Sequence, residues 1–171
     1  MNIKRIVVGS LDTNCYIVEN ELDCLIIDPG DEFHKIRDNI TKKVVGVLVT
    51  HRHFDHVGVL EEILKFYNVK CYDKSNLING ENNISSFKFN VIYNPGHTFD
   101  SISFIFDNNM FSGDFIFQGT IGRCDLGGDI NLMKDSINDI LNSEINYIIY
   151  PGHGECTTLN EERVNLDYWL K

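Results

Sequence analysis

The feature that most constrains this chain is His51-Arg52-His53-Phe54-Asp55-His56, which places three histidines and an aspartate within one short segment. The segment follows Val44–Thr50, a nearly continuous apolar run that predicts a central strand buried on both faces. A helix or a strand spreads such neighbours over different directions, whereas an irregular loop can turn them toward one point. Neutral imidazoles and carboxylates bind zinc, iron or manganese. The segment therefore predicts a metal site in a loop at the edge of a sheet.

Three further potential ligands follow strand-like runs elsewhere in the chain. His97 comes after Pro95-Gly96, Asp114 comes after Ser112-Gly113, and His153 lies within Pro151-Gly152-His153-Gly154. A neighbouring glycine lets the backbone turn sharply, so each side chain can be directed toward a shared centre. Together with the first segment, these residues make five histidines and two aspartates, which is enough for two metal ions.

The remaining pattern consists of short strands interrupted by helices. β-Branched or apolar runs between turn residues predict the strands. Apolar residues at helical spacing predict helices over 33–40, 57–67, 133–141 and 158–170. Asp129 or Asn131 is the expected N-cap of the third helix, and the polar stretch Asp73–Asn83 is expected to be a loop. This order favours an α/β fold in which helices cover the outer faces of sheets.

Composition restricts the class of protein and its partners. With 171 residues, 43% of them hydrophobic and 23% charged, the chain is expected to form one globular domain over residues 1–171. No apolar run approaches the ~20 residues of a membrane-spanning helix, and the first residues do not resemble a signal peptide. A net charge of −10 disfavours binding to nucleic acid or to a membrane surface. Five cysteines without paired spacing favour reduced thiols and a cytoplasmic location, while the oligomeric state stays open.

The order and spacing of the motifs resemble the metallo-β-lactamase superfamily, in which an H-x-H-x-D-H loop is followed by a single His, a single Asp and a final His. The resemblance implies a four-layer αβ/βα sandwich of two mixed β-sheets flanked by helices. It also implies a site for two divalent metal ions at one edge of the sandwich, with zinc as the first choice and iron or manganese as alternatives.

The resemblance implies a role for each residue of the motifs. It assigns His51, His53 and His97 to the first metal, Asp55, His56 and His153 to the second metal, and Asp114 to both as a bridge. Asp28, in Asp28-Pro29-Gly30, matches a buried aspartate that supports the metal loop from behind.

Two segments narrow the resemblance to the glyoxalase II-like, or hydroxyacylglutathione hydrolase-like, branch in its single-domain form. The stretch from Gly113 to Asp125 matches the pattern G-D-x-x-F…G-x-x-G-R-x-D, and Asn14-Cys15-Tyr16 fits the same branch. These proteins are thioesterases that cleave small hydroxyacyl thioesters by attack of a metal-bound hydroxide. The resemblance implies that Asp55 and Asp114 are the catalytic carboxylates. Arg123 is the candidate for binding a substrate carboxylate, because its fork can do so bidentately.

The ligand set leaves other reactions open. A single iron held by His51, His97 and Asp114 is suited to persulfide dioxygenation, and other branches of the superfamily are lactonases or nucleases. The complete ligand set disfavours a mere binding protein. Many zinc β-lactamases carry a cysteine where this chain has Asp114, so antibiotic hydrolysis is not expected as the native role. Larger glyoxalase II enzymes hold glutathione with a C-terminal helical domain. Because this chain ends at Lys171, we expect a weak preference for glutathione.

Overall fold

The first of two large sheets is built by the N-terminal part of the chain. The computed structural model describes residues 1–171. The first sheet contains, in this spatial order, β1 (Asn2–Val8), β2 (Thr13–Glu19), β3 (Asp23–Ile27), β4 (Lys43–Leu48) and β5 (Cys71–Tyr72). The first three strands are antiparallel, and the last three are parallel to one another. The parallel pairs are possible because α1 (Phe33–Asp38) and α3 (Leu60–Tyr67) form the crossovers between them.

The second sheet is built by the C-terminal part of the chain. Its spatial order is β13 (Thr157–Thr158), β12 (Ile148–Pro151), β9 (Asn109–Gly113), β8 (Ile102–Phe106), β7 (Phe87–Tyr93) and β6 (Gly80–Ile84). Strands β6 to β9 are antiparallel, whereas β12 runs parallel to β9 because α4 (Ile130–Leu141) lies between them in the sequence. A small ribbon of β10 (Ile116–Phe117) and β11 (Thr120–Ile121) follows β9, and α5 (Leu159–Leu170) ends the chain.

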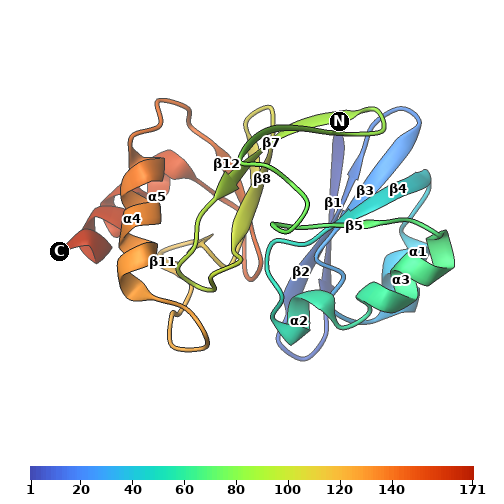
Figure 1. Ribbon diagram of the computed structural model, residues 1–171, viewed down its shortest axis with the longest axis horizontal. Coiled ribbons are helices and arrows are strands. Elements are labelled where there is room, and N and C mark those ends of the chain that lie inside the picture. Colours follow the sequence, from blue (N-terminus) through green and yellow to red (C-terminus); the bar gives the residue numbers. More distant parts are fainter.

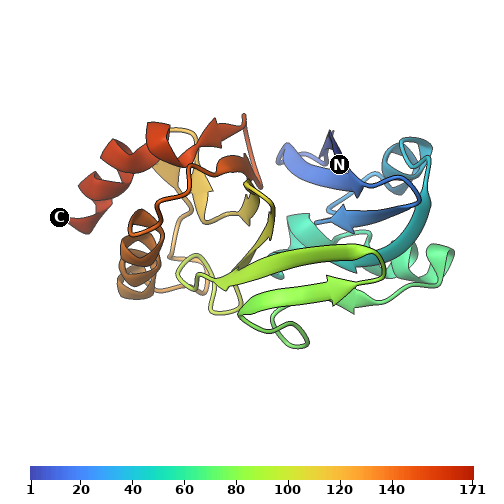
Figure 2. The same ribbon diagram turned by 90° about the horizontal axis from the view of Figure 1, so that it is seen from above.

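The elements form four layers, which confirms the predicted αβ/βα sandwich. In Figure 1, α1 and α3 lie at one end of the molecule, α4 and α5 lie at the other, and the two sheets lie between them. Figure 2 shows the same arrangement from above, with the blue and cyan first part of the chain opposite the orange and red last part. No helix is both long enough and apolar enough to cross a membrane.

Three apolar clusters separate the four layers. The cluster between the sheets contains Tyr16 and Leu25 from the first sheet together with Phe104 and Phe111 from the second. A second cluster lies between the first sheet and α1 and α3, and a third lies between the second sheet and α4 and α5. Strands β2 and β3 have an apolar cluster on each face. Their residues are therefore buried throughout, and their sequences do not alternate between apolar and polar residues as those of half-exposed strands do.

Some sequence predictions were wrong in detail. The stretch Asp73–Asn83, predicted as a loop, contains the start of β6, whose polar residues pair with β7 at the edge of the sheet. The histidine segment is also not an irregular loop throughout, because Phe54–Val57 forms the one-turn helix α2 that carries Asp55 and His56. Of the two candidate caps for α4, Asp129 is the N-cap, and its side chain accepts hydrogen bonds from the backbone N–H groups of Asn131 and Leu132.

Candidate metal centre

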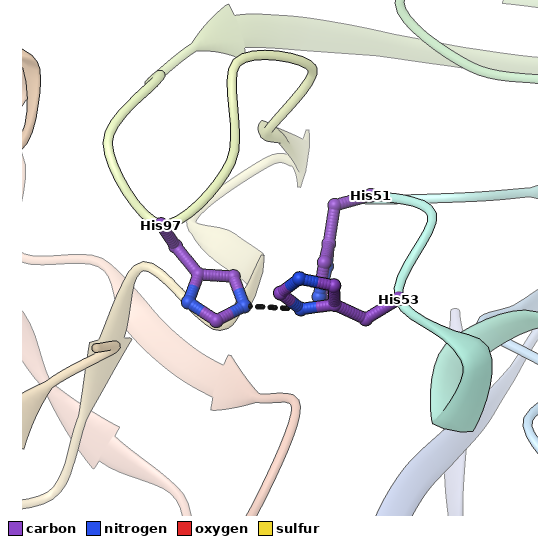
Figure 3. Close-up of side chains that lie close together, drawn as sticks. All are labelled: His51, His53 and His97. Carbon is purple, nitrogen blue, oxygen red and sulfur yellow. Dashed lines mark hydrogen bonds between the residues drawn. The ribbon is translucent and has the colours of Figure 1, made fainter. Parts of the chain in front are cut away.

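The structure brings all seven predicted ligands together at one edge of the sandwich. Each segment that carries them follows the end of a strand: the histidine segment follows β4, and the single residues His97, Asp114 and His153 follow β7, β9 and β12. Residues from both sheets therefore meet at this edge. In Figure 3, His51 and His53 extend from the loop after β4 toward His97, which extends from the facing loop.

Two groups of three are formed by the predicted ligands, and a third consists of His51 and His56 with Asp28. His51, His53 and His97, which we call the first trio, have ring nitrogens within 4.8 Å of one another. The second trio, which consists of Asp55, His56 and His153, meets the same limit. Two groups of this kind, side by side, are the arrangement that a pair of metal ions requires.

Asp114 lies between the two trios. Its Oδ2 atom is 3.4 Å from His97 Nε2 and 3.6 Å from His153 Nε2, and its Oδ1 atom is 3.3 Å from His56 Nε2. The carboxylate therefore faces the first trio and the second trio at once. This is the position that a bridging ligand needs.

Backbone carbonyls fix the orientation of three imidazoles. His97 Nδ1 donates a hydrogen bond to the carbonyl of Arg123 at 2.6 Å, His53 Nε2 donates to the carbonyl of Leu126 at 3.0 Å, and His153 Nδ1 donates to the carbonyl of Leu11 at 3.0 Å. A carbonyl oxygen only accepts, so each of these nitrogens carries the proton. The other nitrogen of each ring keeps its lone pair and is available to a metal ion.

Asp28 and Thr50 fix the other two imidazoles. The buried Asp28 carboxylate accepts hydrogen bonds from His56 Nδ1 at 2.9 Å and from Thr50 Oγ1 at 2.6 Å. Because the Thr50 hydroxyl donates to Asp28, its oxygen can accept a hydrogen bond from His51 Nδ1, which lies 3.1 Å away. Both rings then direct Nε2 toward the centre. The supporting position predicted for Asp28 matches these contacts.

Several polar atoms at the centre have no hydrogen-bond partner, and a bound cation would satisfy their lone pairs. His51 Nε2, His56 Nε2 and Asp114 Oδ1 are buried and make no hydrogen bond. His97 Nε2 and His53 Nδ1 lie 2.8 Å apart, although both carry lone pairs once their other nitrogens donate outward (Figure 3). Two lone pairs at that distance repel each other unless a proton or a cation lies between or beside them. The donor set therefore fits divalent metal ions bound to imidazole and carboxylate.

The pKa shifts of the residues at the centre also favour the binding of cations. Burial opposes the charging of His56, but its contacts with Asp114 and Asp28 outweigh burial and raise its pKa to about 10. Burial also opposes the charging of Asp114, yet His56 and the other imidazoles lower its pKa to about 2. In the first trio, burial lowers the pKa of both His51 and His97. The environment thus favours positive charge on His56, between the carboxylates, and neutral imidazoles at His51 and His97.

Glycines allow the segments to approach closely. A Cβ atom on Gly152 would lie 2.2 Å from Asp114 Oδ1, and one on Gly113 would lie 2.4 Å from Thr50 Oγ1. Gly113 also has a φ of 52°, a left-handed conformation that disfavours other residues. The two glycines therefore let Asp114 and the loop after β12 reach the histidine segment.

Strand β2 connects the second trio to the opposite sheet. Thr13 Oγ1 donates to Asp55 Oδ2 at 2.9 Å, and Thr13 forms an isolated bridge with His153. The buried Asn14 amide donates to the carbonyls of Pro151 and Gly154, at 2.9 Å each. The loop that carries His153 is thus held by side chains of the first sheet.

The centre lies on the floor of a cavity of about 680 Å³. The cavity is lined by five candidate ligands and by polar and apolar side chains, namely Leu11, Phe54, Phe117, Thr120, Ile121, Arg123 and Leu126. The Arg123 side chain forms a bidentate ion pair with Asp125, with contacts of 2.6 Å and 2.5 Å. Both side chains are largely exposed, so this pair is weak and can open.

Sequence reasoning missed the contacts made by Thr13, Thr50 and Asn14, and it missed the three carbonyls that orient imidazoles. A threonine next to the first histidine and a polar pair at the start of β2 were the available signals. The carbonyls left no signal, because every residue carries one. The structure shows a contact of the Arg123 backbone carbonyl with His97, whereas substrate binding by its side chain stays a prediction.

Comparison with known proteins agrees with this geometry. The model of the metallo-beta-lactamase superfamily matches residues 8–72 and 73–153. A Bacillus subtilis protein named "Probable metallo-hydrolase YqgX" is 32% identical, with 96% of each chain covered. "Hydroxyacylglutathione hydrolase GloC" from Haemophilus influenzae is 30% identical, with 95% of each chain covered.

A solved structure extends the agreement to the whole fold. The crystal structure of BLEG-1, a B3 metallo-beta-lactamase, superimposes with a TM-score of 0.89 at 28% identity, covering 99% of this chain and 100% of the other. The family match spans most of the chain, including every candidate ligand. The chain belongs to the metallo-beta-lactamase superfamily.

Proposed function

We propose that this protein is a metal-dependent thioesterase that cleaves small hydroxyacyl thioesters. The observation that carries the proposal is the pair of trios around Asp114 on the floor of an open cavity. In this proposal His51, His53 and His97 would hold one divalent ion, Asp55, His56 and His153 would hold a second, and Asp114 would be a ligand of both. Zinc is the first choice of metal, because imidazole and carboxylate are its usual ligands in catalytic sites.

When bound, such ions lower the pKa of water toward neutrality and polarise a carbonyl oxygen. The overall reaction adds water to the thioester carbonyl carbon and breaks the C–S bond. The products are a carboxylate, a thiol and one proton. The chain itself has to hold the acyl group above the trios and to orient the attacking water.

Asp55 is the side chain best placed to orient that water. Burial opposes its ionisation, but contacts with His153, His56 and Thr13 hold its pKa well below the usual range. The group is therefore a carboxylate at neutral pH and accepts hydrogen bonds. Thr13 Oγ1 fixes one of its oxygens at 2.9 Å. Asp114 has the second catalytic role, because it sets the spacing of the two trios.

Two observations support a thioester as the substrate. The segment Gly113–Asp125 carries the pattern shared with glyoxalase II-like proteins, and a relative similar over nearly the full chain is named a hydroxyacylglutathione hydrolase. Arg123, at the cavity wall, is the proposed partner for a substrate carboxylate. It is the only lysine or arginine in the lining, so a dedicated site for the two carboxylates of glutathione is not proposed.

The test is hydrolysis of lactoyl thioesters by protein loaded with zinc, with thiol release as the readout. We expect turnover that falls by more than about 100-fold in His97→Ala and His153→Ala, because each loses one candidate ligand. His34→Ala is the matched control. His34 is an exposed histidine of α1, outside the centre, and its loss should leave the rate unchanged. Full activity of His97→Ala would refute the assignment.

A second candidate reaction is persulfide dioxygenation. His51, His97 and Asp114 form a set of two histidines and one carboxylate, which is the ligand set of many non-haem iron oxygenases. The discriminating measurement is oxygen uptake with a persulfide substrate, together with the metal count. One iron per chain and persulfide-dependent oxygen uptake, without thioester cleavage, would replace the first proposal by the second.

The proposed location is the cytoplasm. All five cysteines are free thiols, and Cys71, Cys124 and Cys156 are only partly buried. Thiols of this kind persist in a reducing compartment. Fractionation of the source cells, with detection of the native protein, tests this proposal.

A further inference from the structure

Three of the side chains that line the cavity are large, apolar and exposed. Leu11, Phe54 and Leu126, which we call the apolar rim, are 52%, 74% and 54% exposed, and all three line the cavity. Phe117 and Ile121 line it as well. A cluster of exposed apolar side chains beside a cleft commonly marks the place where a ligand binds.

The apolar rim is attached to the metal centre by its own backbone. The carbonyl of Leu11 accepts the hydrogen bond from His153, and the carbonyl of Leu126 accepts the one from His53. Phe54 lies between His53 and Asp55 in the chain and begins α2. The segments that contact or carry the candidate ligands therefore also carry the three apolar side chains that line the cavity.

The side chains around the cavity do not favour a multiply charged anionic substrate. Arg123 is the only lysine or arginine in the lining, and its guanidinium pairs with Asp125 in an exposed ion pair that a single substrate carboxylate can open. The chain as a whole carries a net charge of −10. The lining therefore offers one cationic side chain, and not the cluster that a multiply charged anion requires.

We infer that the thioester carries an uncharged apolar group, alkyl or aryl, which packs on Leu11, Phe54 and Leu126 while the carbonyl lies over the metal centre. This inference rests on the proposed thioesterase activity and defines its substrate class. The apolar group can belong to the acyl part or to the thiol, and the two arms of the experiment distinguish these sources.

The experiment measures kcat/KM of the zinc-loaded protein for two series of thioesters. In the thiol series, lactate is joined to N-acetylcysteamine, to benzyl mercaptan or to glutathione. In the acyl series, lactoyl and phenyllactoyl groups are compared on N-acetylcysteamine. We expect the aromatic member of one series to exceed its small neutral counterpart by roughly tenfold or more, as is typical of groups that fill an apolar pocket.

Substitutions in the apolar rim test whether its side chains cause the preference for aromatic substrates. Phe54→Ala and Leu126→Ala should each reduce the ratio between the aromatic and the small substrate by roughly threefold or more. Phe66→Ala is the matched control. Phe66 is also an exposed phenylalanine on a helix, with 57% exposure, but it does not line the cavity. It should leave the ratio unchanged.

A binding measurement keeps the inference separate from the proposed activity. The probe is a keto analogue of the benzyl thioester in which CH₂ replaces sulfur, compared with its short neutral counterpart by calorimetry. We expect tighter binding of the benzyl analogue, and we expect this binding to be weaker in Phe54→Ala.

Equal binding of the two analogues overturns the inference, whether or not thioesters are cleaved. Cleavage of thioesters without any preference for apolar groups also overturns it and leaves the proposed function intact. Failure to cleave any thioester refutes the proposed function instead.

Discussion

The two trios differ in charge and in what orients them. The first trio consists of three imidazoles, two of which are oriented by backbone carbonyls and one by the Thr50 hydroxyl. The second trio contains a carboxylate, and its buried member His56 is held by the carboxylate of Asp28. Burial lowers the pKa of His51 in the first trio, whereas the neighbouring carboxylates raise that of His56 in the second.

The difference shows how one fold can build two unlike sites beside each other. In the first trio burial lowers the pKa of His51 and His97, so these two imidazoles can bind a cation without first losing a proton. The second trio contains one carboxylate and two imidazoles whose pKa values its carboxylate neighbours raise, so protons compete there with a cation. Both trios draw residues from both sheets, so each exists only when the sheets are packed. Substitutions that change the first trio, the second trio or both can show how much each trio contributes to metal binding and turnover.

The largest effect is expected for Asp114→Ala, which removes the side chain that faces both trios. We expect fewer than two metal ions per chain and a turnover reduced by more than about 100-fold, because losing a ligand costs more than losing a supporting contact. Elemental analysis and thioester kinetics on the same preparation measure both. Two tightly bound ions in an active variant would contradict the bridging position.

The next largest effect is expected for Asp28→Asn, which acts mainly on the second trio. The carboxylate accepts from Thr50 N through one oxygen and from Thr50 Oγ1 and His56 Nδ1 through the other, whereas an amide has only one acceptor oxygen. One side of the new amide therefore presents N–H groups to a donor, which weakens the hold on His56. One of two metal-binding steps should weaken by about 10- to 100-fold in competition with a chelator.

Asp23→Asn is the matched control for that change. Asp23 is likewise a buried aspartate, at the first residue of β3, whereas Asp28 follows the last; Asp23 accepts hydrogen bonds from Ser85 and Ser86, away from the centre. The metal affinity of this variant should equal that of the wild type. Equal losses in both variants would show that buried charge at the ends of β3, and not the orientation of His56, controls binding.

A smaller effect is expected for Asn14→Ala, which releases the loop of the second trio from β2. The variant loses one buried and one partly buried hydrogen bond, at about 1 kcal/mol each, so its free energy of unfolding should fall by about 2 kcal/mol. Chemical denaturation of the metal-free protein measures this loss. Asn131→Ala, at an exposed position of α4, is the control and should change stability by less than about 0.5 kcal/mol.

The smallest effect is expected for Thr13→Val, which keeps the shape of the side chain but removes the hydrogen bond to Asp55. Asp55 keeps its contact with His153, at 3.2 Å, so the second trio stays assembled. We expect turnover to fall by about tenfold or less, consistent with one lost hydrogen bond to a charged group. Metal content should not change. A loss of metal as large as in Asp28→Asn would mean that Thr13, and not Asp28, determines the second trio.

The sequence predicted the sandwich and the meeting of the seven residues, because histidines, aspartates and glycines at strand ends are chemically distinctive. It did not predict β6, whose polar residues pair with β7 at an edge and carry no apolar alternation. It did not predict α2, because a single turn is too short for a periodic pattern. The roles of Thr50 and of the carbonyls of Leu11 and Leu126 depend on tertiary placement, which no local pattern encodes.

The most direct test of the account is anomalous diffraction from crystals of the protein loaded with zinc. We expect two anomalous peaks, one among the nitrogens of the first trio and one within the second trio, each at about 2.0–2.2 Å from its ligands. Both peaks should contact Asp114 and lie about 3.5–4 Å apart. A single peak, or peaks away from these seven side chains, would contradict the assignment of the metal centre.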